Sequence, residues 1–410
     1  MMKILWVKSG PLFPLNTGGR RRTHAMLEAL SRNHEVTYLA MLPEGHELAA
    51  GENEASYARE KIWITNPEPK KRSPAFFLAL AKNLFFSNTP YILDRYRNAT
   101  FAEKLLELDA SGRFDLILCD FLTPAINFEH DQLRTKAILF QHNVEAQIWK
   151  RLAEEQTNPI TKFYFQDQFR RMRSAEKNLS RPFAGVITVS EQDATQCRKE
   201  YDLSNVLGAV PTGVDTEFFS PPDPRSPKPG LIGFLGSMDW MPNIECVEYF
   251  VAEILPSVLE KHPKASFRII GRDPTLSVRL LAERHSNIEV TGTVDDVRPH
   301  LDECEVLVVP LRSGGGTRIK IFEAMAQGVP VVSTTIGAEG LPVKDGETIL
   351  IADEAAEFAE AVARVLKSEK LRKNLAKQSR NLLLQNHSWD RVISNFLELI
   401  RTTGLQIRTN

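Results

Sequence analysis

Short apolar segments recur along the whole chain and are separated by longer amphipathic stretches. These segments are KILWV, EVTYLAML, FDLILCD, KAILFQH and AGVITVS in the first half, and LIGFLGS, SFRIIG, IEVTGT, VLVVPL, VPVVST and ILIAD in the second. They lack a strict alternation of apolar and polar residues, which is typical of strands buried on both faces of a parallel sheet. The stretches between them, such as 244–262, space their apolar residues as a helix does. We therefore expect an α/β fold built from doubly wound parallel sheets.

The chain is expected to form two domains of this kind. Its 410 residues are enough for two. A segment at 210–230 contains six prolines, a density that neither a helix nor a central strand tolerates. We predict that it links an N-terminal domain at 1–209 to a second domain at 231–387. Ser388 can cap a last helix within 388–410, and the apolar stripe of that helix needs a surface to pack on.

Composition excludes several classes of protein. Lys and Arg number 51 against 52 Asp and Glu, so no overall positive field attracts nucleic acid. Four separated cysteines without C-x-x-C suggest neither a disulfide framework nor a cysteine zinc site, and a reducing compartment fits best. The N-terminus resembles a first strand rather than a signal peptide, and no apolar stretch has transmembrane length. These features predict a cytoplasmic protein with at most a peripheral membrane contact.

Two places in the first domain could carry chemistry. Ligands of open α/β sheets bind beyond the carboxyl ends of the strands, so the expected site is the cleft between the two domains. A loop with Gly18 and Gly19 leads into the first helix, where backbone N–H groups could hold an anion. It is not G-x-G-x-x-G, so a dinucleotide site is weakly indicated, and a flexible loop is the alternative. His142 follows the fourth apolar segment and could either hydrogen-bond a reacting sugar or diphosphate or merely cap its strand.

The segment VLVVPLRSGGGTRIKIFEAMAQGVPVV (306–332) is the most informative part of the second domain. Three glycines precede a helix, and Arg318 and Lys320 add positive charge, an arrangement that predicts a phosphate site. It does not fit a Walker A loop. Glu323 either forms a surface pair with Lys320 or accepts two ribose hydroxyls. IIGRDP (269–274) and TGTVDDV (291–297) follow buried strands and could read a nucleobase edge, although each alone is merely a turn.

These motifs together resemble the retaining nucleotide-sugar glycosyltransferases of family four, which have the GT-B fold of two Rossmann-like domains. The resemblance spans nearly the whole chain and includes VPTGVDTEFF, GSMDWMPN and, most specifically, FEAMAQGVPVVS. It implies that Glu323 binds the donor ribose, that His142 lies near the transferred sugar and that the last helix crosses back to the first domain. The catalytic residues that we expect are His142, Arg318 and Lys320, and the donor-binding residues are Gly18, Gly19, Gly236, Gly271, Arg272, Val294, Gly315, Gly316, Thr317 and Glu323.

Two positions depart from the family pattern. A second glutamate of many members, eight positions before the ribose ligand, is Gly315 here. The Arg and Lys that usually follow the first strand of the second domain are missing from 236–243. We therefore expect Arg318 and Lys320 to replace this phosphate clamp, as in a similar branch with G-T-R-x-K that includes bacterial exopolysaccharide sugar transferases.

The resemblance implies transfer of a hexosyl or related sugar from a UDP- or GDP-type donor to an acceptor hydroxyl, with retention, in cell-surface polysaccharide or glycolipid synthesis. It implies no cofactor, no metal and no covalent carboxylate nucleophile, so N–H dipoles and Arg or Lys must meet the charge of the diphosphate. Two alternatives stay open. One is a non-catalytic nucleotide-sugar-binding subunit, and the other is a GT-B nucleotide-sugar 2-epimerase, which needs no acceptor.

Two basic segments indicate a possible contact with the inner face of a membrane. Segment 70–97 has six basic residues and one acid, and segment 150–183 has eight basic and four acidic residues. Aromatic residues are interspersed in the first segment: Phe76, Phe77, Phe85, Phe86 and Tyr91. Basic charge beside exposed aromatics fits an anionic membrane and a lipid-linked acceptor. Core aromatics beside a solvated face fit equally well, because periodicity alone does not show exposure.

Overall fold

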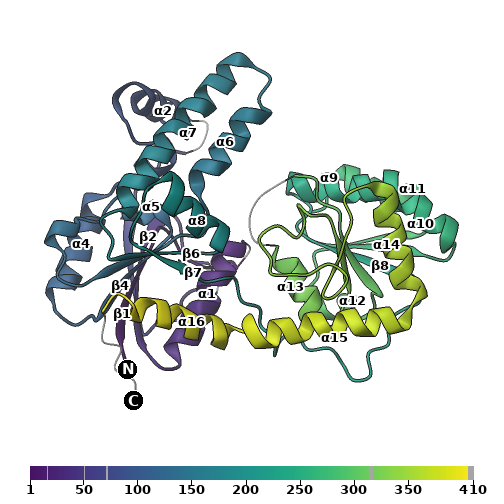
Figure 1. Ribbon diagram of the computed structural model, residues 1–410. Helices are drawn as coiled ribbons and strands as arrows, with labels where there is room; N and C mark the ends of the chain where they lie inside the picture. Colours follow the sequence, from purple (N-terminus) through teal and green to yellow (C-terminus); the bar gives the residue numbers. More distant parts are fainter. Residues whose placement is uncertain (16, 50, 71–72, 314–317, 405–410) are drawn as a thin grey trace. The chain divides into compact units, whose positions relative to one another are not determined.

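The computed structural model describes residues 1–15, 17–49, 51–70, 73–313 and 318–404, without the side chains of 155 and 160. The chain forms two compact units (Figure 1). The first consists of Met1–Pro211 and Val392–Asn410, and the second of Thr212–Arg391. The polypeptide therefore leaves the first unit at residue 211 and returns to it at residue 392.

The first unit is built around a seven-stranded parallel sheet in the order β3-β2-β1-β4-β5-β6-β7. Its strands are β1 (Lys3–Lys8), β2 (Glu35–Pro43), β3 (Glu60–Asn66), β4 (Leu116–Asp120), β5 (Ala137–Phe140), β6 (Gly185–Thr188) and β7 (Val206–Ala209). Its helices are α1 (Gly18–Ser31), α2 (Pro74–Phe86), α3 (Tyr91–Asp94), α4 (Ala99–Ala110), α5 (Leu122–Ala125), α6 (Glu145–Glu155), α7 (Pro159–Ser180) and α8 (Glu191–Glu200), with a short 3-10 turn at His130–Gln132.

The second unit has a six-stranded parallel sheet in the order β10-β9-β8-β11-β12-β13. Its strands are β8 (Leu231–Leu235), β9 (Ser266–Ile270), β10 (Ile288–Gly292), β11 (Val306–Val309), β12 (Val331–Ser333) and β13 (Leu350–Ile351). Its helices are α9 (Met241–Tyr249), α10 (Leu255–Lys261), α11 (Leu276–Arg284), α12 (Arg298–Asp302), α13 (Ile319–Ala326), α14 (Ala355–Lys367) and α15 (Glu369–Asn386). A last helix, α16 (Trp389–Arg401), begins in the second unit and ends in the first.

The predicted fold class is confirmed. Each of the eleven apolar segments contains a strand, and the two sheets are parallel. The strand order reverses between β1 and β4 in the first unit and between β8 and β11 in the second. Ligands of open α/β sheets bind at such reversals, outside the carboxyl ends of the strands. The topology therefore directs attention to the residues that end or follow β1, β4, β8 and β11.

The helix expected at 244–262 is interrupted. Residues Phe250–Ile254 form a π-helical turn between α9 and α10. Pro256 lies in the first turn of α10, where its missing N–H removes a hydrogen bond that an uninterrupted α-helix would need. The π-helical turn absorbs this local mismatch and keeps Phe250, Val251 and Ile254 buried.

Helix α16 packs on the first unit. The side chains of Val392, Ile393, Phe396 and Ile400 are buried along one face of it. The ring of Phe396 lies 5.7 Å from that of Phe140, measured between centroids. This buried face accounts for most of the apolar stripe that the sequence showed in the last helix.

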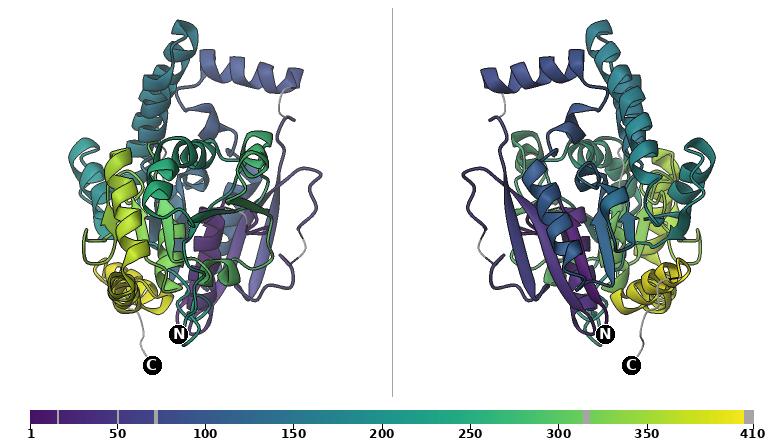
Figure 2. Two further views of the ribbon diagram at one scale, coloured as in Figure 1. Left: turned by 90° about the vertical axis from the view of Figure 1, so that its right-hand side faces the viewer. Right: turned by 90° about the vertical axis from the view of Figure 1, so that its left-hand side faces the viewer.

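Helices α2, α6 and α7 form a projection from the first unit, which we call the arm. Figure 1 shows α6 and α7 as a helical hairpin standing away from the sheet, and Figure 2 shows α2 beside it. The guanidinium of Arg171 on α7 donates hydrogen bonds to backbone carbonyls at the end of α2. No helix of the described residues is both long enough and apolar enough to cross a membrane.

Candidate functional site

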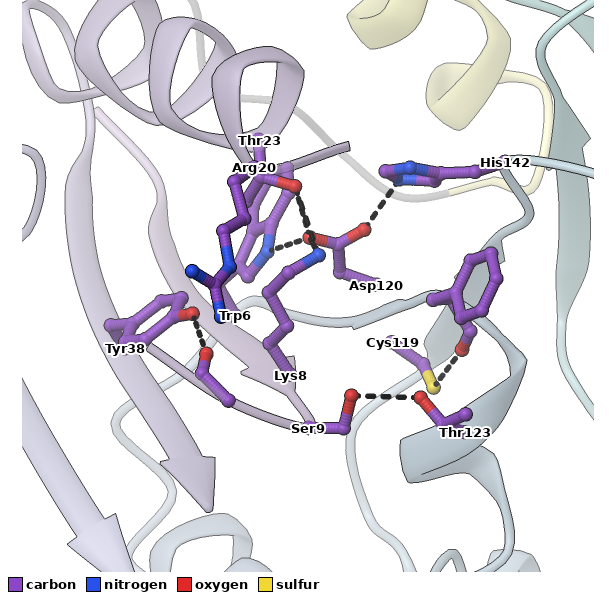
Figure 3. Close-up of polar contacts among 12 residues, drawn as sticks. Trp6, Lys8, Ser9, Arg20, Thr23, Tyr38, Cys119, Asp120, Thr123 and His142 are labelled. Carbon is purple, nitrogen blue, oxygen red and sulfur yellow. Dashed lines mark hydrogen bonds and ion pairs between the residues drawn. The ribbon is translucent and has the colours of Figure 1, made fainter. Parts of the chain in front are cut away.

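A buried carboxylate lies where the strand order of the first sheet reverses. Asp120 ends β4 beside Lys8, which ends β1, and Asp120 is fully buried. Its Oδ2 atom accepts hydrogen bonds from Trp6 Nε1 at 3.0 Å, Lys8 Nζ at 2.7 Å and Thr23 Oγ1 at 2.7 Å (Figure 3). We call these residues, together with His142, the Asp120 cluster. Burial alone would raise the pKa of Asp120, but Lys8 and His142 hold it well below its usual range.

His142 completes this cluster from the neighbouring strand. It follows β5, and its Nε2 atom lies 2.6 Å from Asp120 Oδ1 (Figure 3). Burial lowers the pKa of His142 to about 4, even though Asp120 acts to raise it. The imidazole is therefore neutral near pH 7. Because Nε2 faces a carboxylate, the ring carries its proton there and leaves Nδ1 as a hydrogen-bond acceptor.

The orientation of His142 is fixed by two phenylalanines and by the start of α1. The rings of Phe121 and Phe140 contact the imidazole at centroid distances of 5.5 and 5.0 Å. Phe121 has a φ of 86°, an uncommon value for a residue with a side chain, directly after Asp120. A β-carbon at Gly19 would lie 3.7 Å from His142 Nδ1, so this acceptor faces the first turn of α1. The structure thus brings together His142, Gly18 and Gly19, which open that turn.

A second cation is buried close to this cluster. The guanidinium of Arg22 lies 4.6 Å from the centroid of the Phe140 ring and donates a hydrogen bond to the carbonyl of Val210. Arg22 is 3% exposed, and burial lowers its pKa to about 9. Arg22 is the last of three consecutive arginines at 20–22, which would be solvated if the segment were merely a flexible loop, but its side chain is buried. Its side chain faces the sheet because α1 packs with this side inward.

In the second unit, Lys320 occupies a recess that depends on glycine. Its Nζ atom donates to Asn243 Oδ1 at 2.7 Å and lies 4.3 Å from the centroid of the Phe234 ring. A β-carbon at Gly236 would lie 2.7 Å from Lys320 Nζ, and one at Gly271 would lie 1.7 Å from the Gly236 carbonyl oxygen. Both positions therefore require glycine for the backbones and the ammonium group to approach one another. The structure brings Gly236, Gly271 and Lys320 together beyond the ends of β8 and β9.

The charged side chains around this recess are shielded from solvent. Burial lowers the pKa of Lys320 to about 8, with a further lowering by Arg318 and an opposing effect of Glu323. Arg318, at the start of α13, is 3% exposed, and Glu323 within α13 is 8% exposed. The alternative of a Lys320–Glu323 pair on a solvated surface is therefore wrong. The helix turns both the carboxylate and the cations toward the protein interior.

Other expected site residues lie nearby in sequence but differ in setting. Arg272 follows Gly271, and its guanidinium lies within 4.0 Å of the carboxylates of Asp239 and Asp273. Val294 is partly buried, and its side chain packs against the hydrophobic core of the second unit. Gly315, Gly316 and Thr317 lie outside the described residues. Within the described part of the chain, no group of three or more His, Cys, Asp or Glu could hold a metal ion.

Sequence reasoning missed several members of these two clusters. It did not single out Asp120, Lys8 or Thr23 in the first unit, nor Asn243 in the second. A signal for Asp120 existed, because an acidic residue at the end of a fully apolar strand needs a partner at the same sheet edge. Lys8 ends the first strand and was the available cation. Thr23 and Asn243 could not have been found this way, since helix packing brings them to their partners.

Comparison with known proteins identifies the family. Residues 16–218 match the model "Glycosyltransferase Family 4", and residues 229–368 match "Glycosyl transferases group 1". An uncharacterised 44.6 kDa protein in the cps region of Klebsiella pneumoniae is 19% identical over 407 residues, which cover 97% of this chain and all of that protein. Phosphatidyl-myo-inositol mannosyltransferase of Mycobacterium tuberculosis is 27% identical over 209 residues, or 48% of this chain and 54% of that enzyme.

Solved structures agree with this match. The structure of HepE from Anabaena in complex with UDP superimposes with a TM-score of 0.68 at 13% identity, covering 98% of this chain and 100% of that one. At this identity the similarity concerns the fold alone. Together with the two family models, which cover both units, it establishes what kind of protein this is. The chain is a glycosyltransferase with the GT-B fold, whose first part matches family 4 and whose second part matches group 1.

Proposed function

We propose that this glycosyltransferase moves a hexosyl or related sugar from a UDP- or GDP-type donor to an acceptor hydroxyl, with retention of the anomeric configuration. The proposed acceptor is a sugar or a lipid-linked hydroxyl of a cell-surface polysaccharide or glycolipid. Such an acceptor would be met in the cytoplasm at the inner face of the membrane. The proposal requires no cofactor.

The Lys320 recess is the observation that carries this proposal. Its ammonium group is paired with a neutral amide and an aromatic ring. A diphosphate would supply the negative charge that these partners lack, and a charge-assisted hydrogen bond to it contributes about 1.5–3 kcal/mol. Glu323 lies on the same helix as Lys320, and its carboxylate could accept two ribose hydroxyls. A cation for phosphate and a carboxylate for ribose are the two functions that a nucleoside diphosphate needs.

Each group has a distinct part in the proposed transfer. Lys320 and Arg318 would stabilise the leaving diphosphate as its negative charge develops, which favours the transition state over the bound substrate. The neutral His142 would accept a hydrogen bond from the transferred sugar through Nδ1, because Asp120 holds the proton on Nε2. The first turn of α1, at Gly18 and Gly19, would add backbone N–H groups for the diphosphate.

The relatives support the choice of substrates. The mannosyltransferase of Mycobacterium tuberculosis is named for a phosphatidyl-myo-inositol acceptor, and HepE is seen with UDP. A lipid-linked acceptor and a nucleoside-diphosphate donor are therefore chemically plausible starting points for assays. They guide the donor screen, in which UDP- and GDP-sugars are compared directly.

Donor binding can be tested with Glu323→Gln. The purified chain is titrated with UDP and GDP by calorimetry, and UDP- and GDP-sugars are screened by thermal shift. We expect the variant to bind the preferred diphosphate at least about tenfold more weakly, since the amide accepts ribose hydroxyls less well than a carboxylate. Glu347→Gln, at an exposed position of the second unit, is the control. Unchanged affinity in Glu323→Gln would contradict the assignment of the ribose site.

Product analysis separates the proposed transfer from the two alternatives. A donor consumed only in the presence of an acceptor, with the same anomeric configuration in the product by NMR, supports the retaining transferase. A donor converted to its 2-epimer without any acceptor would identify an epimerase. Donor binding without turnover across the acceptors tested would favour a non-catalytic binding subunit.

A further inference from the structure

Helix α2 of the arm has an unusual distribution of side chains. Its sequence PAFFLALAKNLFF contains only two polar residues, Lys82 and Asn83, and yet its one buried residue is the polar Asn83. Four large apolar side chains are exposed instead: Phe77 by 57%, Leu78 by 57%, Phe85 by 76% and Phe86 by 88%. Hydrophobic residues in a soluble protein normally face the core, and a contiguous exposed group of them marks an interaction surface.

The helix is held in this orientation by polar contacts. Asn83 Nδ2 donates to the Thr89 carbonyl at 3.0 Å and to Asp94 Oδ2 at 3.1 Å. The guanidinium of Arg171 donates to the carbonyls of Asn83 at 3.0 Å and Leu84 at 2.8 Å, and also to that of Ser87. At the other end, Ser73 Oγ caps the helix by accepting from Phe76 N–H at 3.1 Å. These contacts anchor the polar side of α2 and leave its apolar side outward.

The exposed residues form one continuous strip with a cation in it. Phe77, Leu78, Ala81, Lys82 and Phe85 are all exposed and follow the i, i+1, i+4, i+5, i+8 spacing of a single helix face. On α7 of the same arm, Phe163 is 71% exposed and its neighbour Lys162 is exposed as well. Lys70, shortly before α2, is also exposed. We call Phe77, Leu78, Lys82, Phe85, Phe86, Lys162 and Phe163 the arm surface.

The chemistry of this surface identifies its partner. Phenylalanine and leucine enter the boundary between lipid headgroups and acyl chains, while lysine extends its ammonium group back to the headgroups. Helix α2 carries Lys82 and no acidic residue, and Lys162 is exposed on α7 of the same arm, which suits anionic lipid. A second copy of this chain fits poorly, since symmetric pairing through α2 would bring Lys82 toward another Lys82 with no acid of that helix between them.

We propose that the arm surface docks the protein on anionic lipid bilayers, with α2 lying in the plane of the headgroups. This surface shares no residue with the Asp120 cluster or the Lys320 recess, so its variants test docking without altering the proposed transfer site. The sequence suggested this role for 70–97 and 150–183 without showing which aromatics are exposed. The structure removes two aromatics from the candidate membrane contact. Phe76 and Tyr91 are partly buried, and the centroids of their rings lie 5.8 Å apart.

Vesicle flotation with the full chain tests the proposal. Vesicles of phosphatidylcholine alone are compared with vesicles that also contain phosphatidylglycerol, at low salt. We expect flotation only with the anionic vesicles. Adding salt to about 0.5 M should weaken it, because screening removes the lysine contribution. Absence of flotation with the anionic vesicles, or equal flotation with both kinds, would overturn the proposal.

Variants locate the contact. Phe85→Ser with Phe86→Ser, and separately Lys82→Glu, should each reduce the bound fraction at least about tenfold. Leu276→Ser and Lys344→Glu are matched controls, since both side chains are exposed in the second unit, and they should float like wild type. Equal flotation of the arm variants and wild type would contradict the proposal. So would a wild-type dimer, measured by sedimentation, that the phenylalanine variant converts to a monomer.

Discussion

Each unit has a lysine near the carboxyl ends of its parallel strands, but the surroundings of the two ammonium groups differ in charge. Lys8 in the first unit forms an ion pair with Asp120 at 2.7 Å. The same carboxylate accepts hydrogen bonds from Trp6 and Thr23 and lies next to His142 Nε2. Lys320 in the second unit is hydrogen-bonded to the neutral Asn243 and lies over the ring of Phe234. The first charge is neutralised by a carboxylate within the fold, whereas the described contacts of the second are with neutral groups.

This difference suits a structural role for Lys8 and the diphosphate-binding role that we propose for Lys320. Removing one partner of a buried ion pair leaves an uncompensated charge and is costly. Removing a buried cation whose described hydrogen-bond partner is a neutral amide relieves a desolvation cost instead. The lowered pKa of Lys320, about 8, reflects that cost. Substitution of Lys8 should therefore lower the free energy of unfolding, whereas substitution of Lys320 should mainly slow sugar transfer.

The largest effect is expected for Lys8→Met. The side chain of Asp120 would remain fully buried without its cation, and the free energy of unfolding of the first unit should fall by about 3 kcal/mol or more. Urea unfolding followed by circular dichroism measures the change. Lys8→Met combined with Asp120→Asn should recover part of the loss, because the unpaired charge is gone. A loss below about 1 kcal/mol in the single variant would show that the pair is not structural.

Lys320→Met should show the reverse pattern. We expect kcat to fall at least about tenfold, equivalent to about 1.4 kcal/mol in the barrier, while the free energy of unfolding changes by less than about 1 kcal/mol. Arg318→Ala is expected to slow transfer by a similar factor. Lys344→Met, which alters an exposed lysine, is the control for both. Normal turnover in both site variants and in their double variant would contradict the proposal that Arg318 and Lys320 stabilise the leaving diphosphate.

The smallest effect is a pH dependence that belongs to Lys320. Its pKa is about 8 in the folded protein and near 10.5 in the unfolded chain, so the unfolded chain binds more protons between these values. The contribution of Lys320 to stability should therefore rise as pH increases through this window, because folding releases a proton there. Diphosphate affinity should fall over the same range, since the neutral amine no longer attracts the anion. Neither trend should be present in Lys320→Met.

Most strands were predictable from the sequence, including β10 and β13 at the edges of the second sheet, whereas β3 and β7 at the edges of the first sheet were not. Unbroken apolar segments predict the central strands, which are buried on both faces: β1, β4, β5, β8 and β11. Strand β3 lies at the edge of its sheet and is only partly buried, and charged residues at its start leave an apolar run of only three residues, 62–64. Strand β7, at the opposite edge, has four residues including Gly208.

The candidate site was predictable only in part, for a related reason. Residues adjacent to a motif, such as Lys320 and Glu323, can be recognised from local spacing. The partners Lys8 and Asp120 are 112 positions apart, and only the strand order brings them side by side. Exposure on α2 is also a tertiary property, because Phe76 and Phe77 are neighbours with identical side chains and only one of them is largely exposed.

The path of the chain through α16 has a consequence for biosynthesis. Residues 392–401 complete the first unit but are translated after the whole second unit. Until they leave the ribosome, the surface near Phe140 that receives Phe396 has no cover. The unit that is synthesised first is therefore the one that finishes folding last, and the usual order of domain folding during translation is reversed. A nascent chain stalled before residue 392 would expose this apolar surface to chaperones and proteases even though its second unit could already fold.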